Sequence, residues 1–249
     1  MQLTTNARPA IATFFSYWDA GKTVLILPKH LFGGSMLIIY NVPVSTYTAK
    51  LRVTLRHKGL AWKELPPPGG YGSAEYKAIV PSGNIPAMVH DGFMLADSEA
   101  IAEYLNEAFP DVPMLPADLR QRAKAREFGR LHDTRLEPNV RALFPQVAHA
   151  TRDMDAVRTC GAALSQSLKA LELLLSHSQL PTDQLWLCDT GFAITFAWID
   201  AMETALGVPV EWPTAVRAYQ TRLHGFKAVS DELEFYRPAM EDYLQKARP

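Results

Sequence analysis

Cysteine is scarce in this sequence, which has two cysteines, Cys160 and Cys188, among 249 residues. They are too few and too far apart for the dense disulfide framework of a small secreted domain, and they lack the close spacing of a metal site. The seven histidines are scattered, and none forms a metal-type pair. We therefore expect a reducing compartment, the cytoplasm, and no bound metal.

A strong charge of either sign is also missing, because the formal net charge is −1. Nucleic acid is therefore not favoured as a partner, since nucleic-acid-binding proteins concentrate Lys and Arg on one surface. The apolar run TVLILP at 23–28 is far too short to cross a membrane, which takes roughly 20 residues. The remaining composition, 48% hydrophobic and 20% charged, is that of an ordinary globular protein.

The most informative stretch is PSGNIPAMVHDGFMLADSEAIAEYL, residues 81–105. It begins with a turn-forming Pro-Ser-Gly-Asn sequence, and short apolar runs at 86–90 and 93–96 then predict two strands. Asp91-Gly92 between these strands is the strongest short signal for a tight turn. The stretch therefore predicts a β-hairpin.

A helix is predicted immediately after the hairpin. Asp97 and Ser98 suit its first turn, because acidic and hydroxyl side chains accept hydrogen bonds from the unpaired backbone N–H groups there. Ile101 and Leu105 follow at helical spacing. A hairpin followed by a capped helix is a common structural unit, and by itself it implies no ligand.

The preceding residues extend this unit into a small α/β domain. Strands are predicted at 37–40 and 62–65, with a helix at 46–58 between them and at most a short helix at 75–79. The helix at 46–58 mixes apolar and basic residues, and we assign to its solvent side Lys50, Arg52, Arg56 and Lys58. The order β-α-β, short helix, β-β-α is a thioredoxin-like layout.

The second half of the chain is helical in pattern. Residues 110–118 hold three prolines in nine positions and show no periodicity, which is typical of a linker between domains. The helices predicted beyond it lie at 119–150 with a bend near Pro138, 155–177, 192–206, 213–225 and 238–246. The predicted fold class is therefore α/β followed by all-α.

Two segments resemble the glutathione S-transferase family, namely 81–105 and the block STYTAKLR at 45–52. The resemblance is specific in the first half of the chain and loose in the second. It implies glutathione as co-substrate, a small hydrophobic electrophile as second substrate, and a homodimer. The domains that it implies are a thioredoxin-like glutathione-binding domain at 36–110, a linker at 111–118, and an all-α domain with the electrophile pocket at 119–249.

Residues 1–35 precede the resemblance, which begins at Met36. We interpret them as a poorly ordered extension, or as the product of a start codon placed upstream of a true start at Met36. A targeting role is disfavoured, because the apolar run comes late and no small-residue cleavage pattern is clear. The chain from Met36 onward is expected to fold without them.

The resemblance also assigns residues to glutathione binding. In the family the proline at the position of Pro86 is cis, and it turns the backbone of the residue before it, here Ile85, toward the cysteinyl unit of glutathione. The acid–serine pair, here Asp97-Ser98, holds the γ-glutamyl end, in keeping with the affinity of helix N-termini for carboxylates. Asn84 stands where many members place Lys, Arg or Gln for the glycine carboxylate, and it is a weaker partner.

Ser45 is the candidate for the hydroxyl that activates the glutathione thiol. In zeta-, tau- and omega-type members the catalytic serine or cysteine lies seven residues before an arginine, as Ser45 lies before Arg52. Ser45 would also cap the helix, because both roles use the same helix end. Tyr40 is the rival, since other classes use a tyrosine at the end of the first strand. Aligned through 42–44, however, their tyrosine falls on Asn41, and one step along a strand reverses the face.

The electrophile site is assigned to Thr46 and Tyr47, which follow Ser45, and to His132 and Arg135 on the first helix of the second domain. A solvated helix face explains the last two equally well. Two other functions remain open, a zeta-type isomerase or dehalogenase and a non-catalytic glutathione-binding protein of the same fold. The serine-serine-cysteine run of the zeta type is here Ser45-Thr46-Tyr47, which disfavours the isomerase.

A capping box in the second domain is one further family feature, with Ser or Thr followed three residues later by Asp. Ala193 and Phe196 occupy those places in this sequence. Asp189 or Thr190 is the alternative, as the cap of a slightly longer helix.

Overall fold

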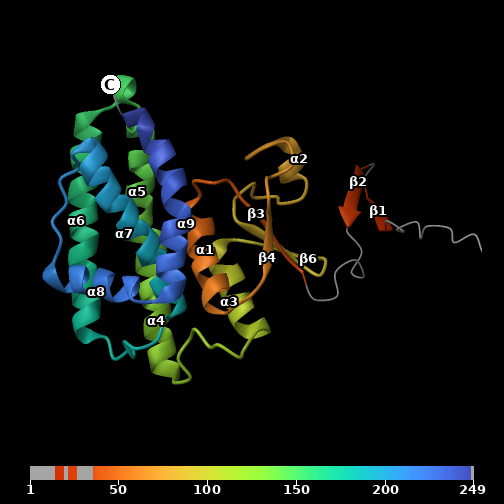
Figure 1. Cartoon of the computed structure of the whole chain (residues 1–249), viewed down its shortest axis with the longest axis horizontal. Helices are drawn as coiled ribbons and strands as arrows, with labels where there is room; N and C mark the ends of the chain where they lie inside the picture. Colours follow the sequence, from red (N-terminus) through yellow and green to blue (C-terminus); the bar gives the residue numbers. More distant parts are fainter. Residues whose placement is uncertain (1–14, 20–21, 27–35, 248–249) are drawn as a thin grey trace, which may run out of the picture.

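The computed structural model describes residues 15–19, 22–26 and 36–247 of the chain. Its main body consists of a sheet-containing half and a helical half that lie side by side (Figure 1). The elements of the first half are β3 (Leu37–Tyr40), α1 (Thr46–His57), β4 (Trp62–Leu65), α2 (Ala74–Lys77), β5 (Ala87–His90), β6 (Phe93–Ala96) and α3 (Ser98–Ala108). This order confirms the predicted thioredoxin-like layout.

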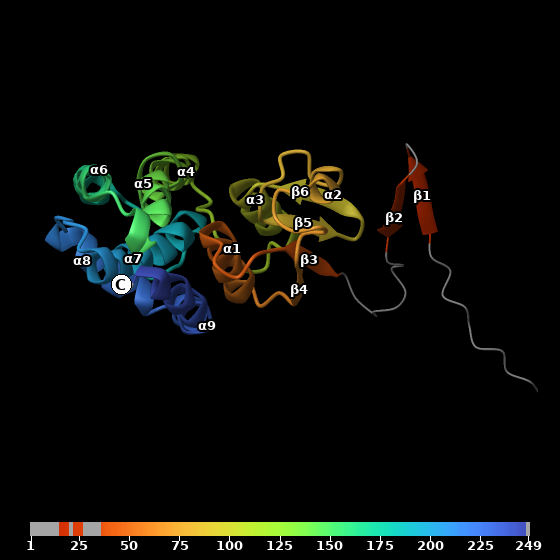
Figure 2. The same cartoon turned by 90° about the horizontal axis from the view of Figure 1, so that it is seen from above.

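The four strands form one mixed sheet in the order β4-β3-β5-β6. Strands β3 and β4 are parallel, because the chain crosses over between them through α1. Strand β5 runs antiparallel to both β3 and β6, and Asp91 and Gly92 make the predicted tight turn with φ of 50° and 90°. Figure 2 shows α1 lying between this sheet and the helical half.

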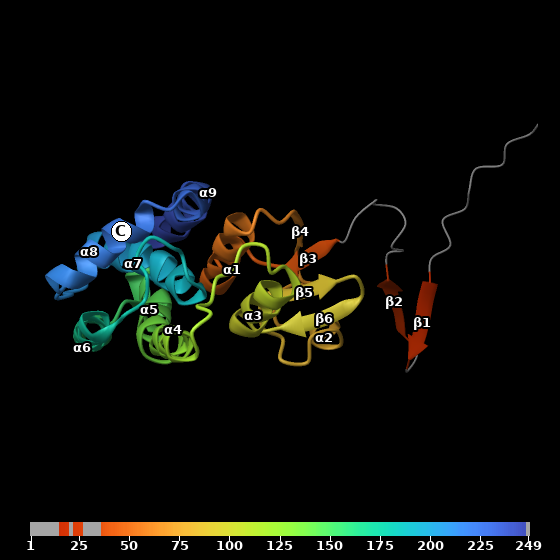
Figure 3. The same ribbon diagram turned by 90° about the horizontal axis from the view of Figure 1, so that it is seen from below.

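Two strands precede the main body, β1 (Phe15–Asp19) and β2 (Lys22–Ile26), and they pair with each other as an antiparallel hairpin. Figure 3 shows this hairpin apart from the main body. The interpretation of residues 1–35 as an extension falls mostly on residues outside those described. It therefore stays a prediction.

The helical half begins at α4 and continues to the end of the described chain. Its elements are α4 (Leu119–Leu131), η2 (His132–Leu136), α5 (Glu137–Leu143), η3 (Phe144–Gln146), η4 (His149–Thr151), α6 (Met154–His177), α7 (Leu187–Leu206), α8 (Thr214–His224), α9 (Lys227–Leu244) and η5 (Gln245–Ala247). Within the described ranges, none of these helices is both long and apolar enough to cross a bilayer.

The predicted bend near Pro138 takes the form of a π-helical turn, η2, between α4 and α5. Proline has no N–H group, so residue 138 cannot donate the hydrogen bond that would continue the α-helix. The Glu137 N–H reaches back to the carbonyl of His132 instead, five residues earlier. Such a wide turn changes the direction of the side chains around it, and π turns are frequent at functional sites.

Two predicted helices begin earlier than the sequence pattern indicated. Helix α7 starts at Leu187, and the Asp189 carboxylate accepts a hydrogen bond from the Trp186 N–H at 2.8 Å. Asp189 therefore caps the longer helix, while Ala193 and Phe196 lie within it. Helix α9 starts at Lys227 and contains Pro238, which the prediction placed at a helix start.

Helix α1 corrects the expectation of a solvent-facing basic side. It contacts α3 on one side and α7 and α9 on the other, so Lys50 is 2% and Arg52 is 1% exposed. Each buried cation has a partner. Lys50 Nζ lies 2.6 Å from Glu99 Oε2, and Arg52 Nε lies 2.7 Å from Glu232 Oε1. The Lys58 ammonium donates to two backbone carbonyls that follow α3.

Replacement of the α7 cap should destabilise the protein. Asp189→Ala removes a cap worth about 1 kcal/mol, and it leaves the buried Tyr219 hydroxyl without its acceptor, at about 1–3 kcal/mol. The free energy of unfolding from urea titration should fall by about 2–4 kcal/mol. Asp183→Ala, at an exposed position before α7, should change it by less than about 0.5 kcal/mol. Equal losses in the two variants would contradict the capping role.

Candidate active site

A cavity of about 640 Å³ lies where the two halves meet at the start of α1. The sheet-containing half lines it with Val42, Val44, Ser45, Thr46, Tyr47, Tyr71, Asn84, Ile85, Asp97 and Ser98. The helical half lines it with Arg130, Asp133, Arg141 and Phe144. The structure thus gathers at one cavity residues that lie as far apart in the sequence as Val42 and Phe144.

Ser45 is the N-cap of α1. Its Oγ accepts hydrogen bonds from the backbone N–H of Thr48 at 3.1 Å and from the Thr48 hydroxyl at 3.0 Å. A serine oxygen has two lone pairs, so the capacity that remains is the donor hydrogen of the Ser45 hydroxyl. This donor lies at the positive end of the α1 dipole, where an anion in the cavity would be stabilised.

Tyr40 lies away from Ser45, in a small core cluster beside α2. Its ring packs edge-on against Tyr76, with ring centroids 5.7 Å apart. Burial raises the pKa of Tyr40, so its hydroxyl is harder to ionise than that of a free tyrosine. This environment agrees with the assignment of Tyr40 to the core.

The peptide bond between Ile85 and Pro86 is cis, as predicted. Ile85 borders the cavity just ahead of β5, and Asn84 borders it beside Ile85. The Asn84 carbonyl accepts a hydrogen bond from the Tyr76 hydroxyl at 2.8 Å. The backbone of this turn is therefore held by a hydrogen bond from α2.

Asp97 and Ser98 form the start of α3, and both border the cavity. Asp97 has a φ of 87°, and its Oδ1 accepts hydrogen bonds from the backbone N–H groups of Glu99 at 3.0 Å and Ala100 at 3.1 Å. Oδ1 thus makes both of these capping bonds. Ser98 is 6% exposed and is the first residue of the helix, where backbone N–H groups favour a carboxylate.

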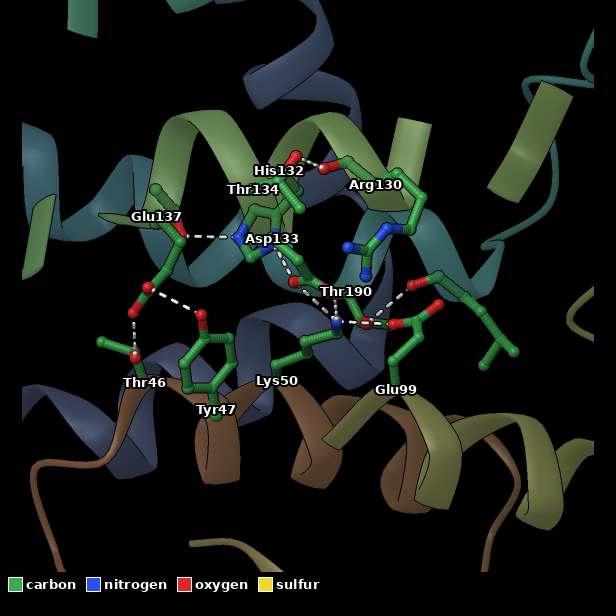
Figure 4. Close-up of polar contacts among 12 residues, drawn as sticks. Thr46, Tyr47, Lys50, Glu99, Arg130, His132, Asp133, Thr134, Glu137 and Thr190 are labelled. Carbon is green, nitrogen blue, oxygen red and sulfur yellow. Dashed lines mark hydrogen bonds and ion pairs between the residues drawn. The ribbon is translucent and has the colours of Figure 1, made fainter. Parts of the chain in front are cut away.

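Glu137 joins the first turn of α1 to the helical half (Figure 4). Its two carboxylate oxygens accept hydrogen bonds from the Thr46 hydroxyl at 2.7 Å and the Tyr47 hydroxyl at 2.8 Å. Arg141 donates to the same carboxylate, and its guanidinium lies 4.9 Å from the centre of the Tyr47 ring. Burial and the neighbouring Glu137 carboxylate raise the pKa of Tyr47, so Tyr47 stays a hydrogen-bond donor.

Lys50 makes a second connection one turn further along α1 (Figure 4). Its ammonium bridges Glu99 on α3 and Asp133 in the π turn, at 2.6 Å and 3.0 Å. Burial alone would raise the pKa of Asp133, but the hydrogen bond from His132 and the Lys50 charge lower it to about 2. For Lys50, the two carboxylates outweigh burial and raise its pKa. Asp133 and Lys50 are therefore both ionised at neutral pH.

The structure places His132 and Arg135 differently from the other residues assigned to the site. His132 is 2% exposed and points into the helical half, where its ring bonds Asp133 Oδ1 and Thr195 Oγ1, each at 2.7 Å. Gly191 makes room for this ring, because a side-chain Cβ there would come within 2.5 Å of it. Arg135 is exposed, and neither residue borders the 640 Å³ cavity as the described residues define it.

Four lining residues of the helical half were missed by the sequence analysis, namely Arg130, Asp133, Arg141 and Phe144. They lie around the π turn, whose altered geometry moves side chains away from the regular helical faces. Pro138 indicated from the sequence that the helix changes direction there. It did not indicate which side chains this change brings to the cavity.

A thioredoxin-like domain joined to a helical half, with a cavity at the start of the first helix, is the architecture of the glutathione transferase class of proteins. Residues 39–113 match the family model described as Glutathione S-transferase, N-terminal domain. Maleylacetoacetate isomerase of Pseudomonas aeruginosa is 32% identical over 159 residues, which cover 59% of this chain and 71% of that protein. The chain belongs to the glutathione S-transferase family.

Two further likenesses extend over more of the chain. Glutathione S-transferase Z2 of Arabidopsis thaliana is 26% identical over 198 residues, covering 76% of this chain and 87% of that protein. The crystal structure of glutathione transferase F2 from Populus trichocarpa has a TM-score of 0.67 at 19% sequence identity, and the match covers 81% of this chain and 99% of that one. The structural likeness supports the fold of the whole main body.

The lowered pKa of Asp133 predicts part of the acid sensitivity of the fold. Asp133 stays ionised in the folded protein down to a pH of about 2, whereas an unfolded aspartate has a pKa of about 3.9. The stability that it contributes is thus present above pH ~4 and is lost as the pH falls toward 2, by about 2–3 kcal/mol.

Asp133→Asn should remove this loss, so the free energy of unfolding should fall less steeply below pH ~4 than in the parent protein. Urea titrations across this pH range measure the slope. The matched variant Asp183→Asn, at an exposed position, should keep the parent slope. An unchanged slope in Asp133→Asn would contradict the assignment.

Proposed function

We propose that this glutathione transferase binds glutathione along the 640 Å³ cavity and activates its thiol with the hydroxyl of Ser45. The observation that carries the proposal is the hydrogen-bonding state of that hydroxyl. Both of its acceptor sites are occupied by Thr48, so its own hydrogen is the group that a sulfur anion would meet.

The reaction requires the thiolate form of glutathione. A free thiol has a pKa of about 8.5, so only a few per cent is ionised at pH ~7. A hydrogen bond from Ser45 and the positive end of the α1 dipole both favour the anion, and they lower the pKa of the bound thiol. The thiol proton passes to solvent, and the sulfur then attacks a carbon atom of the electrophile to form a carbon–sulfur bond. At the same carbon a leaving group departs with its bonding electron pair, or an activated double bond opens and takes up a proton from solvent.

Different elements hold the three parts of glutathione. The Ile85 backbone pairs with the cysteinyl unit, and Ser98 with the first N–H groups of α3 binds the γ-glutamyl carboxylate. Asp97 Oδ2 accepts from the γ-glutamyl ammonium group. Asn84 lies near the glycine end, and Arg130 adds a positive charge to the wall of the same cavity.

The electrophile occupies the side of the cavity next to α5. Val44, Tyr71 and Phe144 give this side an apolar surface, which suits a small hydrophobic molecule. Tyr47 is kept there as a donor by Glu137, and Thr46 is held beside it by the same carboxylate. His132 and Arg135, which the sequence analysis also assigned to this site, do not border the cavity in the described chain, and the proposal does not use them. We also propose that the protein is a homodimer in the cytoplasm, as its resemblance to the family implies.

A glutathione-dependent isomerase is the second candidate function. The relative named maleylacetoacetate isomerase is 32% identical over the matched residues, and this favours it. Conjugation of chlorodinitrobenzene measured beside cis–trans isomerisation of maleylacetoacetate separates the two activities. Retention on immobilised glutathione without either turnover would instead identify a binding protein.

The role of Ser45 predicts the behaviour of the bound thiol. Ser45→Ala removes the donor but leaves Ile85 and Ser98 to bind the tripeptide. The pKa of the bound thiol should therefore rise toward its free value, and conjugation near neutral pH should fall about tenfold for each unit, or about 1.4 kcal/mol. Ultraviolet titration of the thiolate measures this pKa. Tyr40→Phe is the matched control, and it should leave both quantities close to those of the parent protein. A pKa that rises in Tyr40→Phe and not in Ser45→Ala would reverse the assignment.

The role of Ser98 predicts a loss of affinity without a loss of chemistry. Ser98→Ala removes one hydrogen bond to a charged carboxylate, which costs roughly 1.5–3 kcal/mol, or about ten- to a hundredfold in affinity. The KM for glutathione should rise by that factor, whereas kcat at saturating glutathione should be retained. Ser176→Ala, at an exposed position on α6, should change neither constant. A lowered kcat with an unchanged KM would show that Ser98 does not hold the γ-glutamyl end.

A further inference from the structure

The peptide unit between Val44 and Ser45 is held from both sides. Its N–H, on Ser45, donates to the Val42 carbonyl at 3.0 Å. Its C=O, on Val44, accepts a hydrogen bond from the Tyr236 hydroxyl at 2.7 Å. Because a peptide unit is planar, two bonds at its opposite edges fix the orientation of the whole plane. That plane sets the direction in which the Ser45 side chain leaves the backbone.

Tyr236 comes from α9, 192 residues further along the chain than Val44. It is 1% exposed, and its hydroxyl oxygen accepts a hydrogen bond from Trp198 Nε1 at 3.1 Å. The phenol hydrogen is therefore committed to the Val44 carbonyl. Burial raises the pKa of Tyr236, so this donor persists over the range in which a thiol ionises.

The helix that carries Tyr236 is fixed on α1 by ionic contacts. Glu232, four residues before Tyr236, is fully buried, and its two carboxylate oxygens pair with Arg52 at 2.7 Å and Arg56 at 2.9 Å. The Arg52 guanidinium also lies 5.6 Å from the centre of the Tyr236 ring. The position of the Tyr236 hydroxyl relative to α1 is thus set by several independent contacts.

We propose that Tyr236 is a positioning residue for glutathione transfer, because its hydrogen bond to the Val44 carbonyl aims the Ser45 hydroxyl at the thiol. The inference rests on the proposed role of Ser45. Tyr236 acts through the backbone, since Val44 and Ser45 border the cavity and Tyr236 is not among its lining residues in the described chain. The helical half therefore tunes the reactivity of a thiol that the sheet-containing half binds.

The test is the pKa of the glutathione thiol bound to the full chain, measured by ultraviolet titration without an electrophile. Tyr236→Phe keeps the ring and removes the hydroxyl, so the Val44 carbonyl loses its donor. The thiol pKa should rise by about one unit, and kcat/KM near neutral pH should fall about tenfold. The KM for glutathione should stay near the parent value, because the Ile85 and Ser98 contacts are untouched.

Trp198→Phe is the matched control for a loss of stability. It removes one buried hydrogen bond to the same oxygen, but it leaves the Tyr236–Val44 bond intact. It also shrinks a fully buried ring, so its unfolding midpoint should fall at least as far as that of Tyr236→Phe, with an unchanged thiol pKa. A raised pKa in Trp198→Phe would overturn the proposal even if Tyr236→Phe could not be obtained folded, because the effect would then be a general loosening of the core.

Ser45→Ala, measured in parallel, separates the positioning role of Tyr236 from the role of Ser45 itself. A raised thiol pKa in Ser45→Ala with the parent value in Tyr236→Phe would overturn the positioning role alone. The parent value in Ser45→Ala would overturn the proposed role of Ser45 itself. Raised values in Ser45→Ala and Tyr236→Phe, with the parent value in Trp198→Phe, would support both.

Discussion

The pairing of the buried cations on α1 is the constraint on which the rest of this structure depends. Lys50 and Arg52 are almost fully buried, and an unpaired charge at such depth would cost several kcal/mol. Asp133 supplies part of the compensation for Lys50, and Glu232 supplies it for Arg52. Both carboxylates belong to the helical half, so α1 can be buried only while the two halves stay together.

This constraint also determines the geometry of the cavity. Ser45 caps the same helix that the ion pairs hold, so its hydroxyl keeps a fixed position relative to the helical half. Glu137 repeats the arrangement at the first turn of α1, where it binds Thr46 and Tyr47. The start of α1 and the helical wall of the cavity are therefore joined by buried polar contacts. In the proposed reaction this pre-organisation serves the attack by a bound nucleophile.

The charges at the cavity match those of the proposed ligand. Glutathione with an ionised thiol carries three negative groups and one positive group, so its binding needs positive potential on balance. The N-termini of α1 and α3 supply it, together with the guanidinium group of Arg130, whereas the charge of Arg141 is already paired with Glu137. Asp97 is the natural partner of the single ammonium group. Positive potential near the sulfur lowers the thiol pKa, so tight binding and activation of glutathione have the same electrostatic origin.

The sequence alone determined the hairpin turn and the helix starts, because these depend on residues that are close together in the chain. Asp91-Gly92 specifies the hairpin through its tolerance of positive φ, and Ser45 and Asp97 are recognisable as helix starts from their neighbours. The contacts of Lys50 and Arg52 were decided only by the tertiary structure. A charged residue in a helix is predicted to face solvent unless its partner is known. The partners with the shortest contacts, Glu99 for Lys50 and Glu232 for Arg52, lie 49 and 180 residues away. For the same reason, the lining of the cavity by the helical half and the bond from α9 to the loop before Ser45 depend on long-range packing, which no local pattern encodes.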